Sequence, residues 1–247
     1  MSSLSHPQVD LAHIPDVAWH GFTGTDAWRW ACAVAIAAQL RRDLERGSRA
    51  RLLLSGGSTP RPVYRALAKA PLEWDRIDVA LVDECWLMPD DPDSNARTVR
   101  DELLTHHAAS ARFETMTRPG FSVEQAVATA NAHGQQRASV VVLGMGEDGH
   151  VASLFPGMLG LQEALSSQRP YVATDATGCP GARGWSRRIS LTPAGIRASN
   201  ARLLLIRGDR MRDVFQQALA DGSALQWPVL AALESDSQTP LQVYWCP

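Results

Sequence analysis

A glycine-rich loop carries the residues best suited to acid–base chemistry. It runs from Gly144 to Gly157 and contains Glu147, Asp148 and His150. Histidine is the side chain whose ordinary pKa lies near neutrality, so it can both accept and release a proton during turnover. A lone histidine is more often structural than catalytic, but this one follows an apolar run and shares its loop with two carboxylates. We therefore predict that His150 is a general base, with Asp148 or Glu147 orienting its ring.

A second polar segment follows the apolar run 52–54 and consists of Ser55, Gly56, Gly57, Ser58 and Thr59. Paired glycines let a ligand approach the backbone, hydroxyls form hydrogen bonds, and the N–H groups of a helix start attract anions. This pattern indicates a phosphate-binding loop, although an ordinary tight turn from strand to helix would use the same residue types. The segment lacks the endings and spacings of Walker loops and dinucleotide fingerprints, so it does not indicate a nucleotide.

A third polar segment begins with Asp83 and Glu84, directly after the apolar run 77–82, and continues to Ser94 and Asn95. Carboxylates at the end of a strand could orient a sugar hydroxyl, a water molecule or the histidine. Ser94 is better explained as the cap of the helix that follows. Because ligands collect beyond the carboxyl ends of parallel strands, we expect all three segments to meet at one edge of a sheet.

The elements that must position these segments alternate along the chain. A helical pattern extends from Thr25 to Arg46 and ends at Gly47. Short apolar runs typical of buried strands lie at 51–54, 77–82, 140–143 and 203–206, and stretches with helical character lie at 61–70, 95–106, 122–136 and 210–220. Strands that alternate with helices predict an α/β fold with a mostly parallel sheet between two layers of helices.

Length and composition are those of a globular protein. The 247 residues are 45% hydrophobic and 20% charged, which is enough to bury a sizeable core. We predict a single domain over residues 1–247, with 1–20 as a peripheral N-terminal segment. The stretch from Gly178 to Gly184 is a loop too short to demand a domain boundary.

Charge and cysteine usage exclude several classes of partner. A net charge of -2 gives no field that would gather nucleic acid or hold the chain on an anionic membrane. The start of the chain does not resemble a signal peptide, and no run is long enough to span a bilayer, so we expect a cytoplasmic protein. The four cysteines are too far apart for a zinc or dithiol site and are interpreted as reduced thiols: Cys32, Cys85, Cys179 and Cys246.

Taken in order, five segments resemble the 6-phosphogluconolactonases: Ser55–Pro60, Asp83-Glu84 with Ser94-Asn95, Gly144–Pro156, Arg188–Pro193 and Val243–Pro247. The resemblance implies a single Rossmann-like three-layer domain, like that of the glucosamine-6-phosphate deaminases. It also implies hydrolysis of 6-phospho-D-glucono-1,5-lactone to 6-phosphogluconate in the oxidative pentose phosphate pathway, without a metal or organic cofactor. The continuation Ala152–Pro156 favours the lactonase branch over the deaminase branch.

The resemblance also implies roles for individual residues. His150 would activate water, with Asp148, Glu147 and Asp83 as the other catalytic candidates. The sugar phosphate lactone would bind to the loop 55–59, and the remaining candidates for binding it are Asn95, Arg188 and Arg210. Whether the protein is a monomer or a homodimer stays open.

Two departures from the family pattern concern the substrate's phosphate. Cys85 stands where typical lactonases have an arginine, and Met211 stands where they have a lysine. Each lost charge-assisted hydrogen bond would weaken binding by about 1.5–3 kcal/mol. Three accounts remain: another arginine has taken the role (Arg210, Arg212, Arg97 or Arg187), the substrate is a different lactone, or the chain is a non-catalytic relative that binds a sugar phosphate.

Overall fold

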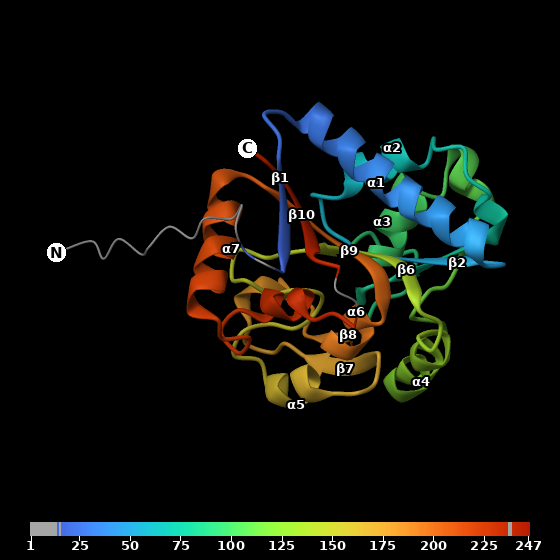
Figure 1. The fold of residues 1–247 in the computed structure, drawn as a ribbon. Coiled ribbons are helices and arrows are strands. Elements are labelled where there is room, and N and C mark those ends of the chain that lie inside the picture. Colours follow the sequence, from blue (N-terminus) through green and yellow to red (C-terminus); the bar gives the residue numbers. More distant parts are fainter. Residues whose placement is uncertain (1–13, 15, 237–238) are drawn as a thin grey trace.

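The centre of the molecule is a seven-stranded parallel sheet, seen in a computed structural model that describes residues 14, 16–236 and 239–247 (Figure 1). Each pair of neighbouring strands is parallel. The order across the sheet is β1 (Val17–Gly21), β10 (Leu241–Cys246), β9 (Ser199–Arg207), β6 (Ala138–Gly144), β2 (Ala50–Leu54), β3 (Ile77–Leu81) and β5 (Arg112–Phe113). The four strands predicted from apolar runs are β2, β3, β6 and β9, so the predicted α/β class with a mostly parallel sheet is confirmed.

Helices cover both faces of this sheet (Figure 1). On one face α1 packs against α2, which packs against α3, and on the other face lie α4, α5 and α6. The helices are α1 (Thr25–Arg46), α2 (Arg61–Leu67), α3 (Asn95–Glu102), α4 (Val123–His133), α5 (Leu161–Ser166), α6 (Pro193–Arg197) and α7 (Asp209–Asp221). The predicted three-layer arrangement is therefore present.

Two details differ from the sequence prediction. The helix expected over 95–106 ends at Glu102, and His106 starts a separate 3₁₀-helix, η3 (His106–Ser110). His106 has φ 49°, a left-handed conformation that cannot continue an α-helix. At the N-terminus, the segment 1–20 was expected to be peripheral, yet Val17–Gly21 pairs with β10 as an edge strand of the sheet. Residues 1–13 and 15 of that segment lie outside the described residues.

A second, three-stranded antiparallel sheet was not predicted. It consists of β4 (Asp83–Cys85), β8 (Arg187–Leu191) and β7 (Tyr171–Asp175), with β8 in the middle. Its register places Cys85 opposite Arg188. The predicted loop Gly178–Gly184 connects β7 to β8 and contains a short 3₁₀-helix, η4 (Pro180–Ala182). This small sheet therefore brings β4 together with the β7–β8 hairpin, which lies far away in the sequence.

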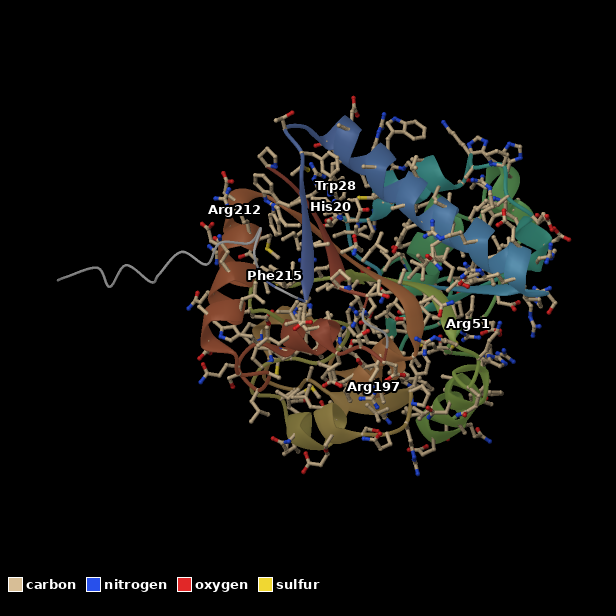
Figure 2. The ribbon with its side chains drawn as sticks, in the orientation of Figure 1. His20, Trp28, Arg51, Arg197, Arg212 and Phe215 are labelled. Carbon is tan, nitrogen blue, oxygen red and sulfur yellow. The ribbon has the colours of Figure 1, made fainter. Side chains whose placement is uncertain are left out.

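Buried polar contacts lie at both ends of the strands of the large sheet. At the carboxyl edge Trp28 of α1 is fully buried, and its Nε1 donates a hydrogen bond to the Tyr244 carbonyl at 3.0 Å. Arg51, near the start of β2, forms a buried ion pair with Glu114 at 2.9 Å. Figure 2 shows Arg51 well away from Trp28, so this ion pair lies far from the carboxyl edge. All four cysteines are free, as predicted.

Among the described residues, no helix is both long and apolar enough to cross a membrane.

Candidate active site

The three polar segments follow strands that are neighbours in the sheet. The order β6-β2-β3 places the loop 55–59, which follows β2, between the histidine loop after β6 and the Asp83 segment after β3. Because these strands are parallel, their carboxyl ends lie at the same edge. Residues that are far apart in sequence therefore surround one region of the surface.

Asp148 and His150 form a hydrogen-bonded pair within their own loop. The Asp148 Oδ1 lies 2.6 Å from the His150 Nδ1 and also accepts the His150 backbone N–H at 3.2 Å. Burial acts to raise the pKa of Asp148, but the hydrogen bond and charge of His150 outweigh it, so the pKa lies below its ordinary value. The other ring nitrogen, Nε2, has no hydrogen-bond partner within the described part of the chain. The pair can thus orient the ring and leave Nε2 for a ligand.

Glycines make this pairing sterically possible. A Cβ on Gly146 would lie 2.1 Å from the His150 ring and 2.7 Å from the Asp148 carboxylate. Gly149 has φ 78°, and a Cβ there would lie 2.5 Å from the Trp227 ring. The close approach of the loop to itself and to Trp227 explains why glycine occupies these two positions.

Arg188 lies beside this pair but is held by the protein. Its Nε donates to the Trp185 carbonyl at 2.7 Å, its Nη2 to the Ala182 carbonyl at 2.8 Å and its Nη1 to the Ser153 hydroxyl at 3.2 Å. The guanidinium also stacks over Phe155, whose ring is 4.4 Å from that of His150 between centroids. With its side chain only 10% exposed, Arg188 is poorly placed to approach a ligand.

Asp83 belongs to the same buried cluster. Its Oδ2 accepts a hydrogen bond from Ser153 at 2.6 Å and lies 3.8 Å from the Arg188 Nη1. Burial raises its pKa above the ordinary value, against the opposing effects of Ser153 and Arg188. The Asn95 amide donates to the Asp83 carbonyl at 2.8 Å. The Asn95 side chain also lies close to Gly56, since a Cβ on Gly56 would be 1.7 Å from the Asn95 Oδ1. Asp83 and Asn95 therefore connect the loop 55–59 to the histidine loop.

Glu84 binds backbone groups at the start of α3. Its fully buried carboxylate accepts the backbone N–H groups of Asn95, Ala96 and Cys85 at 2.8, 2.8 and 3.0 Å. Burial raises the pKa of Glu84 to about 7 despite these hydrogen bonds. Glu84 thus fixes the start of α3, where the Ser94 hydroxyl also accepts the Arg97 N–H as predicted for a helix cap.

The loop 55–59 has unused hydrogen-bonding groups. Gly57 adopts φ 84°, a conformation that favours glycine. Within the described residues, the backbone N–H groups of 56–59 donate to no other group, and the buried hydroxyl of Ser55 has no partner. A group with several acceptor oxygens would satisfy these donors.

Most of the arginines named as candidates for binding the phosphate are paired with carboxylates. Arg210 is exposed and forms an ion pair with Glu147 at 3.0 Å, whereas Asp148 is the carboxylate that is hydrogen-bonded to the His150 ring. Arg97 pairs with Asp101, Arg212 pairs with Asp209 and stacks over Trp245, and Arg187 is exposed on β8. An exposed ion pair contributes little free energy, so Arg210 can exchange Glu147 for a ligand at small cost.

The two positions that depart from the family pattern are apolar. Cys85 is buried, and burial raises the pKa of its thiol to about 12, so it is uncharged and unreactive at neutral pH. Met211 packs against the hydrophobic core. Neither position supplies a hydrogen bond donor comparable to the cation that the resemblance implies there.

Two residues of this edge were not predicted. Gly181, in η4, lies against the catalytic candidates, since a Cβ there would be 2.4 Å from the Asp148 Oδ2. Arg207 ends β9, donates to the Thr25 hydroxyl at 3.2 Å and stacks over Trp28, while its buried Nε has no partner among the described residues. Arg207 could have been noticed because it directly follows a predicted strand, whereas nothing in the sequence places Gly181 near Asp148.

The described residues contain no group of three or more histidine, cysteine, aspartate or glutamate side chains that could hold a metal ion.

Comparison with known proteins finds relatives that are similar over most of the chain. Curated relatives include the 6-phosphogluconolactonase of Xylella fastidiosa strain Temecula1, 48% identical over 90% of this chain and 93% of the relative, and that of Pseudomonas aeruginosa PAO1, 37% identical over 87% and 89%. The crystal structure of a 6-phosphogluconolactonase from Shewanella baltica OS155 superposes with a TM-score of 0.86, at 32% identity over 94% of this chain and 98% of the other.

A more distant structure and a family model complete the comparison. A monomeric glucosamine-6-phosphate deaminase has a TM-score of 0.73 at 20% identity over 92% of this chain and 96% of its own, which confirms the predicted fold. Residues 25–245 match the model of a family described as glucosamine-6-phosphate isomerases/6-phosphogluconolactonase. The chain therefore belongs to the glucosamine-6-phosphate isomerase/6-phosphogluconolactonase family.

Proposed function

We propose that this protein is a 6-phosphogluconolactonase, which hydrolyses 6-phospho-D-glucono-1,5-lactone to 6-phosphogluconate in the oxidative pentose phosphate pathway. The names of its curated relatives support this activity. The observation that carries it is the Asp148–His150 pair, 2.6 Å apart, at the carboxyl edge of β6 beside the loop 55–59. A base and a group of unused N–H donors side by side suit a reaction on a phosphorylated ester.

In the proposed mechanism, Nε2 of His150 takes a proton from water as the water oxygen attacks the lactone carbonyl carbon. The resulting tetrahedral intermediate collapses with cleavage of the bond to the ring oxygen, and the imidazolium returns the proton to that oxygen. Asp148 stays ionised, because its pKa is lowered, and stabilises the imidazolium. Backbone N–H groups of the glycine-rich loops would hold the oxyanion, a contribution of about 3 kcal/mol in enzymes that use one such donor.

The phosphate is proposed to bind at the loop 55–59. Its oxygens would accept the N–H groups of that loop and the hydroxyls of Ser55, Ser58 and Thr59. Arg210 would supply charge by leaving its exposed ion pair with Glu147. Asn95, which packs over Gly56, would hold the loop in place. Arg188 would contribute to the site through the protein groups that it binds.

A second candidate function is hydrolysis of an unphosphorylated sugar lactone. The uncharged side chains of Cys85 and Met211 favour it, because the resemblance implies a cation at each of these two positions. The base and its carboxylate would act identically on either lactone. The two candidates therefore differ in substrate recognition and not in chemistry.

The test compares hydrolysis of freshly generated 6-phosphogluconolactone and glucono-1,5-lactone, each corrected for spontaneous opening, by the wild type and His150→Ala. We expect wild-type turnover of the phosphorylated lactone at a higher kcat/KM, and loss of turnover in the variant. A preference for the unphosphorylated lactone would support the second candidate. No wild-type turnover of either would refute both.

A further inference from the structure

The loop between β7 and β8 covers one side of the Asp148–His150 pair. A Cβ on Gly181 would lie 2.4 Å from the Asp148 Oδ2 and 3.2 Å from the His150 Nδ1. Asp148 uses its other oxygen, Oδ1, to bind the ring. The backbone of Gly181 therefore lies against the carboxylate oxygen that does not bind the ring.

Arg188 fastens this loop to the histidine loop. Two of its donors bind carbonyls that follow Gly181 in the covering loop, those of Ala182 and Trp185. Its Nη1 binds the hydroxyl of Ser153, which belongs to the histidine loop. One largely buried side chain thus holds the two loops in a fixed relation.

From this geometry we infer that Gly181 and Arg188 are positioning residues, which hold the Asp148 carboxylate against the His150 Nδ1 and cover part of its outer oxygen. The inference deepens the proposed function and rests on it, since His150 is the proposed base. An ion pair is stronger where water is excluded, so the cover strengthens the interaction that stabilises the imidazolium. Only glycine lets the covering backbone come this close.

Gly181→Ala isolates this contact from backbone strain. Gly181 lacks the positive φ that disfavours other residues, so alanine can adopt its backbone conformation. The new methyl group must move from 2.4 Å to an ordinary contact distance, a displacement of about 1 Å of the loop or the carboxylate. Displacements of about 1 Å at a reacting group can cost roughly 10²-fold in rate.

Gly178 provides the matched control in the same loop. It has φ 81°, and no atom lies within 4 Å of the position that a Cβ would take. Gly178→Ala therefore strains the loop backbone without contacting Asp148 or His150. A loss of rate that arises from loop strain alone would appear in both variants.

The experiment measures kcat and KM for 6-phosphogluconolactone as a function of pH in the wild type, Gly181→Ala and Gly178→Ala. We expect Gly181→Ala to lower kcat by roughly 10–100-fold with KM nearly unchanged and to move the acid limb of the profile to lower pH, because a hydrated carboxylate favours the imidazolium less. We expect Gly178→Ala to keep the wild-type profile. A wild-type profile in Gly181→Ala, or the same loss in both variants, would overturn the inference.

A second measurement is independent of turnover. Titration of the His150 ring by NMR in the wild type and in Gly181→Ala reports its coupling to Asp148 directly. A midpoint shifted to lower pH in Gly181→Ala alone supports the positioning role, and identical curves contradict it. If the wild type hydrolyses no lactone, the proposed function fails, while this titration still decides whether the cover acts on the pair.

Discussion

Asp148→Asn tests whether the Asp148–His150 pair works as proposed. The substitution keeps the size and planar shape of the side chain but removes the negative charge 2.6 Å from the His150 Nδ1. An amide in this position cannot stabilise a positively charged ring, and it can present its NH₂ group to the ring nitrogen. The variant should therefore fold normally and lose rate.

The size of the loss follows from the geometry. Opposite unit charges 2.6 Å apart interact by about 6 kcal/mol at an effective dielectric constant of about 20, and by about 1.6 kcal/mol in bulk water. The side chains of His150 and Asp148 are 24% and 31% exposed, so the pair lies between these limits. A loss of about 3 kcal/mol of transition-state stabilisation corresponds to a decrease of roughly 10²-fold in kcat.

The assay is lactone hydrolysis corrected for spontaneous opening, with thermal unfolding measured alongside. Asp101→Asn is the control for removal of one carboxylate, because Asp101 lies on α3 and pairs with the exposed Arg97. Glu147→Gln distinguishes the two carboxylates of the histidine loop, and we expect it to lower kcat far less than Asp148→Asn does. An Asp148→Asn variant with a kcat within about threefold of the wild type would refute the reasoning, since that ratio corresponds to less than about 1 kcal/mol.

Three further predictions concern the supporting residues. Gly56→Ala should raise KM and lower the melting temperature, because its Cβ would displace the Asn95 amide; an unchanged KM would contradict this. Arg188→Lys should lower kcat for phosphorylated and unphosphorylated lactones alike, whereas a rise in KM confined to the phosphorylated one would show that Arg188 binds phosphate. Burial raises the pKa of Glu84 from 4.5 to about 7, so its carboxyl group favours the folded state most at low pH. The free energy of unfolding should therefore fall by about 3 kcal/mol as pH rises through that interval. Denaturation from pH 4 to 8 should show this loss in the wild type relative to Glu84→Gln, and parallel curves would be the contrary result.

Patterns within short segments predicted the elements of the fold well. The runs at 140–143 and 203–206 are buried on both sides and became central strands, and the amphipathic helix from Thr25 ends at Arg46 as expected. The small antiparallel sheet escaped prediction because β4 pairs with β8, which lies far away in the sequence. Asp83, for example, pairs with Ser190, and neither the turn chemistry nor the alternation of β4 identifies that partner.

The same distinction between local and distant contacts governs the site. Asp148 and His150 are two positions apart in the chain, so their proximity could be predicted from the sequence. Asp148 and Glu147 differ in the direction of their side chains, which the sequence does not give: Asp148 binds the ring and Glu147 binds Arg210. The three hydrogen bonds of Arg188 to protein groups likewise depend on the folded geometry. A long cation at the edge of a site is equally suited to a ligand and to loop carbonyls, and only the folded geometry distinguishes the two.

This difference between local and distant contacts bears on Cys85 and Met211, where the resemblance implies cations. The base and its carboxylate are fixed by one loop and its glycine neighbours, whereas the phosphate would be held by groups that come from several elements. Substitution of one of those groups leaves the 2.6 Å contact between Asp148 and His150 untouched. A phosphate contact stabilises the bound substrate and the transition state equally. Its loss therefore raises KM and leaves kcat unchanged. A wild-type enzyme with an ordinary kcat and a weak KM for the phosphorylated lactone is therefore what this arrangement of residues predicts.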